Sequence, residues 1–231
     1  MPVYNVAPDL LQQCLHSLET QTYRSWQLIL ADDGSDTPVP DAIRMPHRGQ
    51  AATRNEALRY ATGDYIMFLD ADDYLLPDCL ETAVREIGDN DILQFGMQRV
   101  TTDGELKQKL IPYTFYRLTS ACARLYNRQW LEQHPVQFEE NVYYEDVYFS
   151  VRLWLLHPRY KIIRYLGYCY TVNPDSTTSE IHHQDKKALC DHLRRQLHSA
   201  RTFADKAIVA YTLLRVKLHF FKEQHNRHNN Q

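Results

Sequence analysis

Two short, continuously apolar runs in the sequence each end at a cluster of aspartates. The first run, residues 28–30, leads to Asp32 and Asp33, and the second, residues 65–69, leads to Asp70, Asp72 and Asp73. A strand can dispense with polar alternation only when both of its faces are buried. These runs therefore predict an α/β fold with a mostly parallel, Rossmann-like central sheet that is flanked by helices.

Apolar residues at helical spacing separate the two runs. Helices are expected over residues 10–18, over residues 50–62 with Gly63 as a left-handed cap, and after Pro77 up to Ile87. In open sheets of this kind, ligands bind beyond the carboxyl ends of the strands. Both aspartate clusters are expected at that edge, where a ligand would lie.

The second half of the chain is less regular. Residues 91–100 predict a strand, residues 124–133 a helix, and residues 187–222 a tail that is helical throughout. A further helix is expected to begin near Glu145 and Asp146 and to turn Val147, Val151, Trp154 and Leu155 inward. We divide the chain at residues 1–115, 116–180 and 181–231.

Composition restricts the class of protein. The net charge of −3 over 231 residues gives no general attraction to nucleic acid, although residues 186–227 carry +7. The five cysteines form no close pair, which argues against a zinc site and against a dense disulfide framework. The sequence has neither an apolar run of about 20 residues nor a signal-peptide pattern, so we expect a soluble, cytoplasmic protein.

The clustered acids suggest a cation site. A single acid after a strand is usually a solvated turn residue, but close carboxylates repel one another unless a cation or a reaction uses them. The spacing of Asp70 and Asp72 supplies the hard oxygen ligands that Mg²⁺ or Mn²⁺ prefers. Mg²⁺ completes its shell with water and substrate phosphates, which indicates a diphosphate ligand.

Four segments together resemble the inverting family 2 glycosyltransferases, which have the A-type nucleotide-sugar-binding fold. They are "PVYN", "LQQCLHSLETQTYRSWQLILADDGSD", "RGQAATRNEALRYATGDYIMFLDADDYLLPDCLE" and "YYEDVYFSVRLW", and the resemblance extends from Pro2 to about Ser179. It implies that residues 1–115 bind the nucleotide sugar, that residues 116–180 bind the acceptor, and that residues 181–231 form a basic tail.

The resemblance also implies roles for individual residues. Nucleotide contacts are implied for Asp70 and for Pro2, Tyr4, Asn5, Asp32, Asp33 and Arg54, with Tyr4 near the base, Asp33 on the base and Arg54 near the diphosphate. Asp72, helped by Asp70, would hold the Mn²⁺ or Mg²⁺ ion. Asp146 would be the catalytic base, and we hypothesise that Glu145 raises its pKa.

The implied activity is transfer of a sugar, with a UDP-sugar as the favoured donor, to a glycan or lipid-linked acceptor in bacterial surface polysaccharide synthesis. A sugar nucleotidyltransferase and a catalytically silent nucleotide-sugar binder remain alternatives. The amphipathic tail is expected to pack on its own domain or, as the alternative, to contact the inner face of the membrane peripherally. Two features depart from the family pattern. Met1 alone stands before "PVYN", and residues 34–53 lack the helix and the further strand that relatives usually have there.

Overall fold

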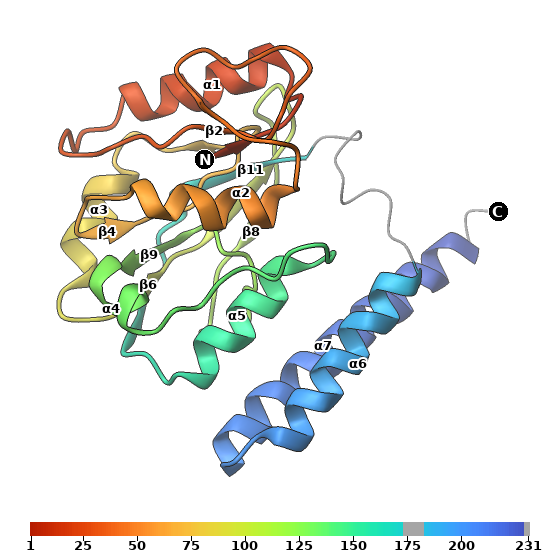
Figure 1. Cartoon of the computed structure of the whole chain (residues 1–231). Coiled ribbons are helices and arrows are strands. Elements are labelled where there is room, and N and C mark those ends of the chain that lie inside the picture. The colour runs from red at the N-terminus through yellow and green to blue at the C-terminus, as the bar shows by residue number, and fades with distance from the viewer. Residues whose placement is uncertain (173–182, 229–231) are drawn as a thin grey trace.

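The computed structural model describes residues 1–172 and 183–228, and it confirms the α/β class. Helices surround three small sheets (Figure 1). The helical elements are α1 (Pro8–Glu19), α2 (Gln50–Ala57), the 3-10 turn η1 (Leu58–Tyr60), α3 (Cys79–Ile87), α4 (Arg128–Gln133), α5 (Glu145–Leu155), α6 (His183–Ser199) and α7 (Phe203–His228).

Every sheet contains parallel pairs of strands. The first sheet is entirely parallel and has the order β1 (Pro2–Val3), β2 (Ala31–Asp32), β3 (Ile43–Arg44). The second has the order β10 (Tyr160–Ile162), β6 (Ile92–Gln94), β9 (Arg124–Asn127), β4 (Tyr65–Ile66). The third has the order β5 (Tyr74–Leu75), β11 (Tyr168–Thr171), β7 (Met97–Val100), β8 (Leu106–Leu110). Antiparallel pairs in the second and third sheets accompany the parallel pairs β10–β6 and β11–β7.

The two apolar runs form less strand than their sequence predicts. Strand β2 begins at Ala31, so the prediction of a buried strand at residues 28–30 is wrong, and the Leu28 side chain is 37% exposed. Strand β4 stops at Ile66, although Phe68 and Leu69 are buried. Within the described residues, no strand pairs with residues 23–30 or 67–70, and a strand is defined by its pairing.

The helix predictions are confirmed for the first and third helices and for the helix that begins at Glu145, whereas the other helical segments need correction. Helix α2 ends at Ala57 and continues only as η1, and Gly63 does not adopt the left-handed conformation expected of a cap. The strand predicted over residues 91–100 is interrupted at Phe95 and Gly96. The tail is divided into α6 and α7 instead of being helical throughout.

Residues 124–127 form strand β9 where the sequence pattern predicts a helix. The strand lies between β6 and β4, antiparallel to both, and buries Leu125 and Tyr126. Helix α4 follows directly, because the Asn127 side chain accepts a hydrogen bond from the Trp130 amide and caps the helix. Pairing with distant strands has overridden the local helical pattern.

An aromatic cluster fixes α5 against the rest of the core. The rings of Phe138 and Phe149 stack with centroids 4.0 Å apart, and Phe68 packs edge-on against both of them. Phe68 lies two residues before Asp70, and Phe149 lies three residues after Asp146. The cluster therefore sets the relative position of the two segments that carry the predicted metal ligand and the predicted base.

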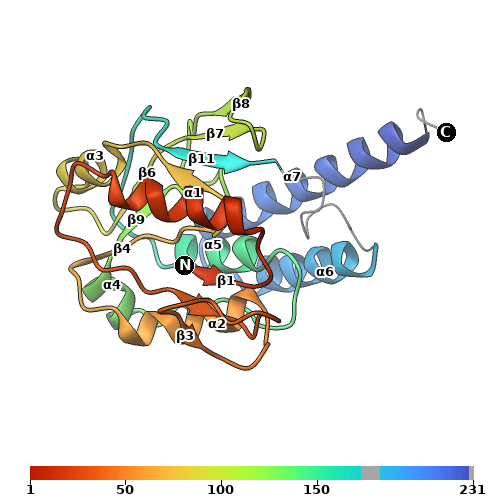
Figure 2. The same cartoon turned by 90° about the horizontal axis from the view of Figure 1, so that it is seen from above.

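Helices α6 and α7 form a hairpin beside α5 at one side of the molecule (Figures 1 and 2). Ile208, Val209 and Leu213 of α7 are buried, which confirms that the tail packs on its own domain. None of the helices in the described ranges has the combined length and apolarity that a membrane crossing requires. The domain boundary expected at residues 180–181 lies outside the described residues.

Asp73 ties the second aspartate cluster to β11. Its side chain is buried, accepts a hydrogen bond from the Tyr168 hydroxyl at 2.5 Å and accepts another from the Thr171 amide at 2.7 Å. Tyr168 is itself fully buried. Asp73 is thus a structural residue, and it fixes the loop that presents Asp70 and Asp72.

Replacing Tyr168 by Phe should lower the free energy of unfolding by about 1–3 kcal/mol, because a buried carboxyl loses one of its two partners. Urea denaturation measures the change. Tyr165→Phe is the matched control, since the Tyr165 hydroxyl bonds Asp78 at the exposed surface and its loss should cost about 0.5 kcal/mol or less. Equal losses in the two variants would contradict the structural role of Asp73.

Candidate active site

Helix α2 connects the two segments that form the candidate site, which are the end of the second apolar run and the first turn of α5. The Asn55 side chain bonds both the backbone nitrogen and the backbone oxygen of Phe138, at 2.9 and 3.0 Å. Just before the helix, Arg48 forms an ion pair with Glu140 at 2.7 Å. These contacts hold the segment that precedes α5 against α2, and so they bring the first turn of α5 to the end of the second apolar run.

Arg54 lies at the centre of this arrangement. Its guanidinium contacts Asp70 Oδ1 at 2.6 Å, Glu145 Oε1 at 3.1 Å and Asp146 Oδ1 at 3.2 Å. Its side chain is only 1% exposed and lies over the Phe138 ring. The structure therefore brings together Asp70, Glu145 and Asp146, which the sequence predicts separately, and it buries Arg54 beneath them.

This position of Arg54 differs from its predicted role. A diphosphate contact requires a guanidinium that faces the ligand, whereas the donors of Arg54 point at three carboxylates. Burial opposes its charge, but Asp70 and Asp146 hold its pKa well above the ordinary value. We therefore assign Arg54 to holding the carboxylates together, while its direct contact with a diphosphate stays a prediction.

The carboxylates around Arg54 exceed its single positive charge. Burial, followed by repulsion from Asp146, raises the pKa of Glu145 to about 7. The pKa of Asp146 is also raised: burial is the main cause, Arg54 opposes it and Asp70 adds to it. Because 26% of the Asp146 side chain is exposed, a substrate can reach it. Asp70 thus raises the pKa of Asp146, and the hypothesis that Glu145 also raises it stays a prediction.

The second aspartate cluster contains a carboxylate, that of Asp72, which is free of ion pairs with the described residues. Burial and the neighbouring Asp70 raise the pKa of Asp72, and its carboxylate makes no ion pair within residues 1–172 and 183–228. Those same ranges contain no group of three or more acidic, histidine or cysteine side chains that could hold a metal on their own. Two carboxylates fit a cation whose remaining ligands are water and substrate phosphate, which is the usual arrangement for Mg²⁺.

The first aspartate cluster is engaged in structural bonds. Asp32 is fully buried, accepts from the Ser35 amide and pairs with Arg44 at 2.7 Å. Asp33 accepts from the amides of Arg48 and Gly49 at 2.8 and 2.9 Å. Both carboxylates thus stabilise the loops beneath the expected nucleotide site, and the contact of Asp33 with a base stays a prediction.

Gly49 has a conformational reason to be glycine. It precedes α2 with φ of +89°, a conformation that side chains other than glycine rarely adopt, and this turns its amide toward Asp33. The Asp33 carboxylate therefore fixes the start of the helix that carries Arg54.

The first loop presents an exposed aromatic face. Pro2 lies in β1, and the Tyr4 ring is 47% exposed and stacks on His47 with centroids 4.1 Å apart. Asn5 adopts a left-handed φ of 46° and exchanges hydrogen bonds with Asp36. The stacked rings of Tyr4 and His47 offer a flat surface of the kind on which a nucleotide base packs.

Three residues of the site have no signal in the sequence. His47 supports the Tyr4 ring and contacts Asp33 at 2.9 Å, Gln50 bonds Asp70 at 3.0 Å, and Asn55 fixes Phe138. His47 precedes α2, Gln50 begins it and Asn55 lies in its second half, and each is within 20 residues of an aspartate cluster along the chain. Only that proximity could have suggested them, because single polar residues in and around a helix are common.

The family model for glycosyl transferase family 2 matches residues 1–150. This match covers more than half of the chain, and it includes both aspartate clusters and the first turn of α5. The chain therefore belongs to glycosyl transferase family 2, as its sequence motifs predict.

Curated relatives agree with this assignment. The chain is 29% identical to the uncharacterized glycosyltransferase EpsJ of Bacillus subtilis, over 88% of this chain and 68% of EpsJ. It is 28% identical to WfgD of Escherichia coli, a UDP-Glc:α-D-GlcNAc-diphosphoundecaprenol β-1,3-glucosyltransferase, over 53% of this chain and 54% of WfgD. The chain thus spans between half and about two thirds of these proteins.

Solved structures define the fold class as the A-type nucleotide-sugar transferase fold. Staphylococcus aureus TarS, in complex with UDP-GlcNAc, superposes with a TM-score of 0.75 and 19% identity, over 92% of this chain and 70% of TarS. The mannosyltransferase PcManGT of Pyrobaculum calidifontis, in complex with GDP-Man and Mn²⁺, gives a TM-score of 0.66 and 18% identity, over 90% and 66%. The predicted fold class is confirmed.

The raised pKa of Glu145 predicts a pH-dependent stability. A carboxyl whose pKa rises from 4.5 to about 7 on folding binds more protons in the folded state between these values. The free energy of unfolding should therefore fall as the pH increases from about 4.5 to 7, by up to roughly 3 kcal/mol at about 1.4 kcal/mol per pKa unit.

Glu145→Gln should make this fall shallower, and urea denaturation at several pH values measures it. Glu132→Gln is the control, because Glu132 pairs with the neighbouring Arg128 on the surface of α4 and should leave the slope unchanged. The same slope in wild type and Glu145→Gln would show that Glu145 is not the titrating group.

Proposed function

We propose that the protein transfers a sugar from a nucleotide-diphosphate donor to a hydroxyl group of an acceptor, with inversion at the anomeric carbon. The observation that carries this proposal is the position of Arg54, which contacts both Asp70 and Asp146. Arg54 thereby holds two carboxylates close together. One is suited to the cation that would bind the donor diphosphate, and the other is suited to the acceptor hydroxyl. Displacement in a single step requires that proximity.

Asp146 is the proposed base. In its ionised form, it takes the proton of the acceptor hydroxyl while the acceptor oxygen forms a bond to the anomeric carbon. The bond from that carbon to the diphosphate oxygen breaks, and its electron pair leaves with the nucleoside diphosphate. The raised pKa of Asp146 favours this role, because a base is most effective when its pKa approaches the working pH.

Asp72, helped by Asp70, is proposed to hold Mn²⁺ or Mg²⁺ together with the donor diphosphate. A divalent cation there would supply electrostatic stabilisation of the charge that develops on the diphosphate. The Mn²⁺ present with PcManGT and its GDP-mannose supports a divalent ion in this fold. Arg54 meanwhile orients Asp70 through the hydrogen bond that it donates to Asp70 Oδ1.

A UDP-sugar is the proposed donor, and a glycan or lipid-linked glycan is the proposed acceptor. The UDP-GlcNAc complex of TarS and the name of WfgD, which specifies UDP-Glc and a diphosphoundecaprenol acceptor, support this choice. The exposed stack of Tyr4 and His47 would receive the base, with Pro2, Asn5 and Asp33 around it. Residues 116–180 would contribute the acceptor side, and bacterial surface polysaccharide synthesis is the proposed setting.

Asp146→Asn should reduce release of UDP from UDP-sugars, in the presence of Mn²⁺ and an acceptor panel, by about 10²–10⁴-fold, because the base is lost. Donor binding, measured by calorimetry, should persist. Asp89→Asn, an exposed carboxylate, is the control and should keep full activity. If Asp146→Asn releases UDP as fast as the wild type, Asp146 is not the base.

Two other results would identify the alternative functions. Pyrophosphate formed from a nucleoside triphosphate and a sugar phosphate would indicate a sugar nucleotidyltransferase. Donor binding without turnover in the wild type and in Asp146→Asn, over the whole acceptor panel, would indicate a catalytically silent nucleotide-sugar binder.

The C-terminal hairpin is the proposed place of peripheral contact with a membrane that carries a lipid-linked acceptor. On α7, Tyr211, Leu214 and Leu218 are 40%, 56% and 52% exposed, and Lys217 lies beside them. An exposed apolar row with adjacent cations is the pattern of an interfacial helix.

A double variant, Leu214→Ser with Leu218→Ser, should reduce co-sedimentation with vesicles of anionic phospholipid severalfold, because it removes apolar surface that would enter the membrane. Leu106→Ser, at another exposed leucine in β8, is the control. Equal sedimentation of the wild type and the double variant would exclude α7 as the contact.

A further inference from the structure

The chain between β8 and β9 runs along helix α5 without forming a helix or a strand of its own. Its backbone polar groups therefore need other partners, because an unpaired amide or carbonyl is costly inside a protein. Residues 115–121, which we name the α5 loop, obtain such partners from side chains of β9 and α5. The conformation of the loop thus depends on a small number of side-chain contacts.

Two successive turns of α5 contact the α5 loop. Asp146 and Ser150 are four residues apart, so they lie on the same face of the helix. The Ala121 amide faces the Asp146 carboxylate as a hydrogen-bond donor. One turn later, the Ser150 hydroxyl donates to the Thr119 carbonyl oxygen at 2.7 Å. The loop therefore runs antiparallel to the helix, and the Ser150 contact lies beside the contact with the proposed base.

Arg124 of β9 contacts both the α5 loop and α5. It is fully buried, its Nη1 donates to the Ser150 hydroxyl at 2.9 Å, and its Nη2 donates to the Leu118 carbonyl oxygen. Its guanidinium carbon lies 5.3 Å from the centre of the Phe115 ring and 6.0 Å from that of Trp154. Burying a guanidinium is costly, and its rigid fork of donors fixes the geometry of the groups that it binds. Arg124 thus fixes the loop relative to the helix.

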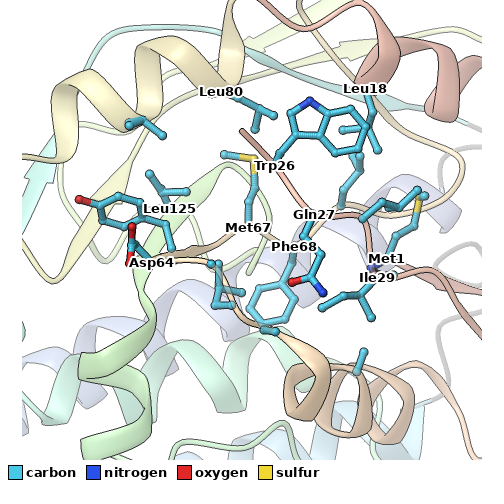
Figure 3. A pocket seen from close by; sticks show the side chains of 18 of the residues that line it. Met1, Leu18, Trp26, Gln27, Ile29, Asp64, Met67, Phe68, Leu80 and Leu125 are labelled. Carbon is cyan, nitrogen blue, oxygen red and sulfur yellow. Dashed lines mark hydrogen bonds between the residues drawn. The ribbon is translucent and has the colours of Figure 1, made fainter. Parts of the chain in front are cut away.

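Strand β9 directs Arg124 toward the loop, because successive residues of a strand point to opposite faces. Leu125 is among the residues that line the cavity in Figure 3, and its neighbours Arg124 and Tyr126 point to the other face. There the Tyr126 hydroxyl donates to the Ala121 carbonyl oxygen at 2.8 Å. Two alternate residues of one strand therefore hold the loop at Leu118 and at Ala121.

Between the α5 loop and β9, the chain passes through a residue in an unfavourable conformation. Ala123 is fully buried and has a φ of +56°, in the left-handed region that alanine rarely adopts. A residue of this kind persists only where the surrounding structure fixes it. The contacts of Arg124, Ser150 and Tyr126 with the loop supply that constraint.

The Asp146 carboxylate has donors from two separate segments. Arg54 of α2 donates to Oδ1 at 3.2 Å, and the Ala121 amide approaches from the α5 loop. A carboxylate with one donor can rotate about its Cβ–Cγ bond, whereas donors from two segments restrict that rotation. Burial raises the pKa of Asp146, whereas the Ala121 amide and the charge of Arg124 favour its ionised form, which is the form that acts as a base.

We propose that Arg124 and Ser150 are positioning residues for Asp146, on which they act through the α5 loop. By holding the carbonyl oxygens of residues 118–119, they keep the Ala121 amide at the Asp146 carboxylate. The carboxylate then keeps the orientation in which it can take the proton of the acceptor hydroxyl. This inference rests on the proposed function, in which Asp146 is the base.

Ser150→Ala removes the hydroxyl that joins Arg124 to the Thr119 carbonyl oxygen. In the UDP-release assay it should lower kcat by about tenfold and leave the donor KM unchanged, because it shifts the base and spares the donor site. Thr212→Val is the matched control, since it also removes a buried hydroxyl, which bonds the Ile208 carbonyl oxygen at 2.9 Å. The control should keep the wild-type kcat. Equal kcat values in Ser150→Ala and Thr212→Val would overturn the proposal.

Arg124→Lys and Arg124→Met separate positioning from packing. Lysine keeps the charge and a donor group for the loop, whereas methionine keeps only an apolar side chain of similar length. The kcat per folded molecule should therefore decrease from the wild type to Arg124→Lys and again to Arg124→Met. Equal kcat values in the two variants would overturn the role of Arg124. If Arg124→Met fails to fold, the comparison of Ser150→Ala with Thr212→Val decides.

Amide hydrogen exchange at Ala121 tests the same contacts without turnover. Ser150→Ala should speed this exchange roughly tenfold or more, because the loop loses one of its contacts, and Thr212→Val should not. Faster exchange in Ser150→Ala, together with a wild type that transfers no sugar, would contradict the proposed function and not the contacts of the loop. Sugar transfer by the wild type, together with unchanged exchange in Ser150→Ala, would overturn the positioning role alone.

Discussion

The contact of one buried guanidinium with three carboxylates determines the geometry of the candidate site. Arg54 receives Asp70 from the end of one apolar run and Glu145 and Asp146 from the first turn of α5. A buried arginine without partners would be strongly destabilising, and so would three adjacent carboxylates without a cation. The guanidinium and the carboxylates therefore compensate one another's buried charge. This mutual compensation keeps the site residues close together.

The aspartates of the sequence motifs fall into two groups that only the structure distinguishes. Asp32, Asp33 and Asp73 are buried and bond backbone amides or neighbouring side chains. Asp70, Asp72 and Asp146 retain some exposure. Each carboxylate of the first group accepts at least two hydrogen bonds, as buried polar groups require. The second keeps an excess of negative charge, which is the condition for binding a cation or accepting a proton.

The sequence predicts the positions of the acidic side chains better than it predicts the strands and their pairing. Acids that follow apolar runs and acids in a helix start are local signals, and they correctly indicate where Asp70 and Asp146 lie. The strand at residues 124–127 has no such signal, because its conformation depends on pairing with β6 and β4, which are distant in sequence. The partnership of Arg54 with Glu145 is equally invisible, since 91 residues separate them.

The prediction of a strand at residues 28–30 is wrong for a related reason. The composition of these residues suits a buried strand, but no strand in the described part of the chain pairs with them, and Leu28 remains 37% exposed. Local composition could not show whether a partner strand was present.

The distance along the chain between Arg54 and its partners has a consequence for biosynthesis. A ribosome adds about 5–20 residues per second, so the donor-side loops emerge several seconds before α5. Until Glu145 and Asp146 have been made, Arg54 has only Asp70 as a partner from this group. A nascent or prematurely terminated chain thus lacks the proposed base until α5 has been translated and packed.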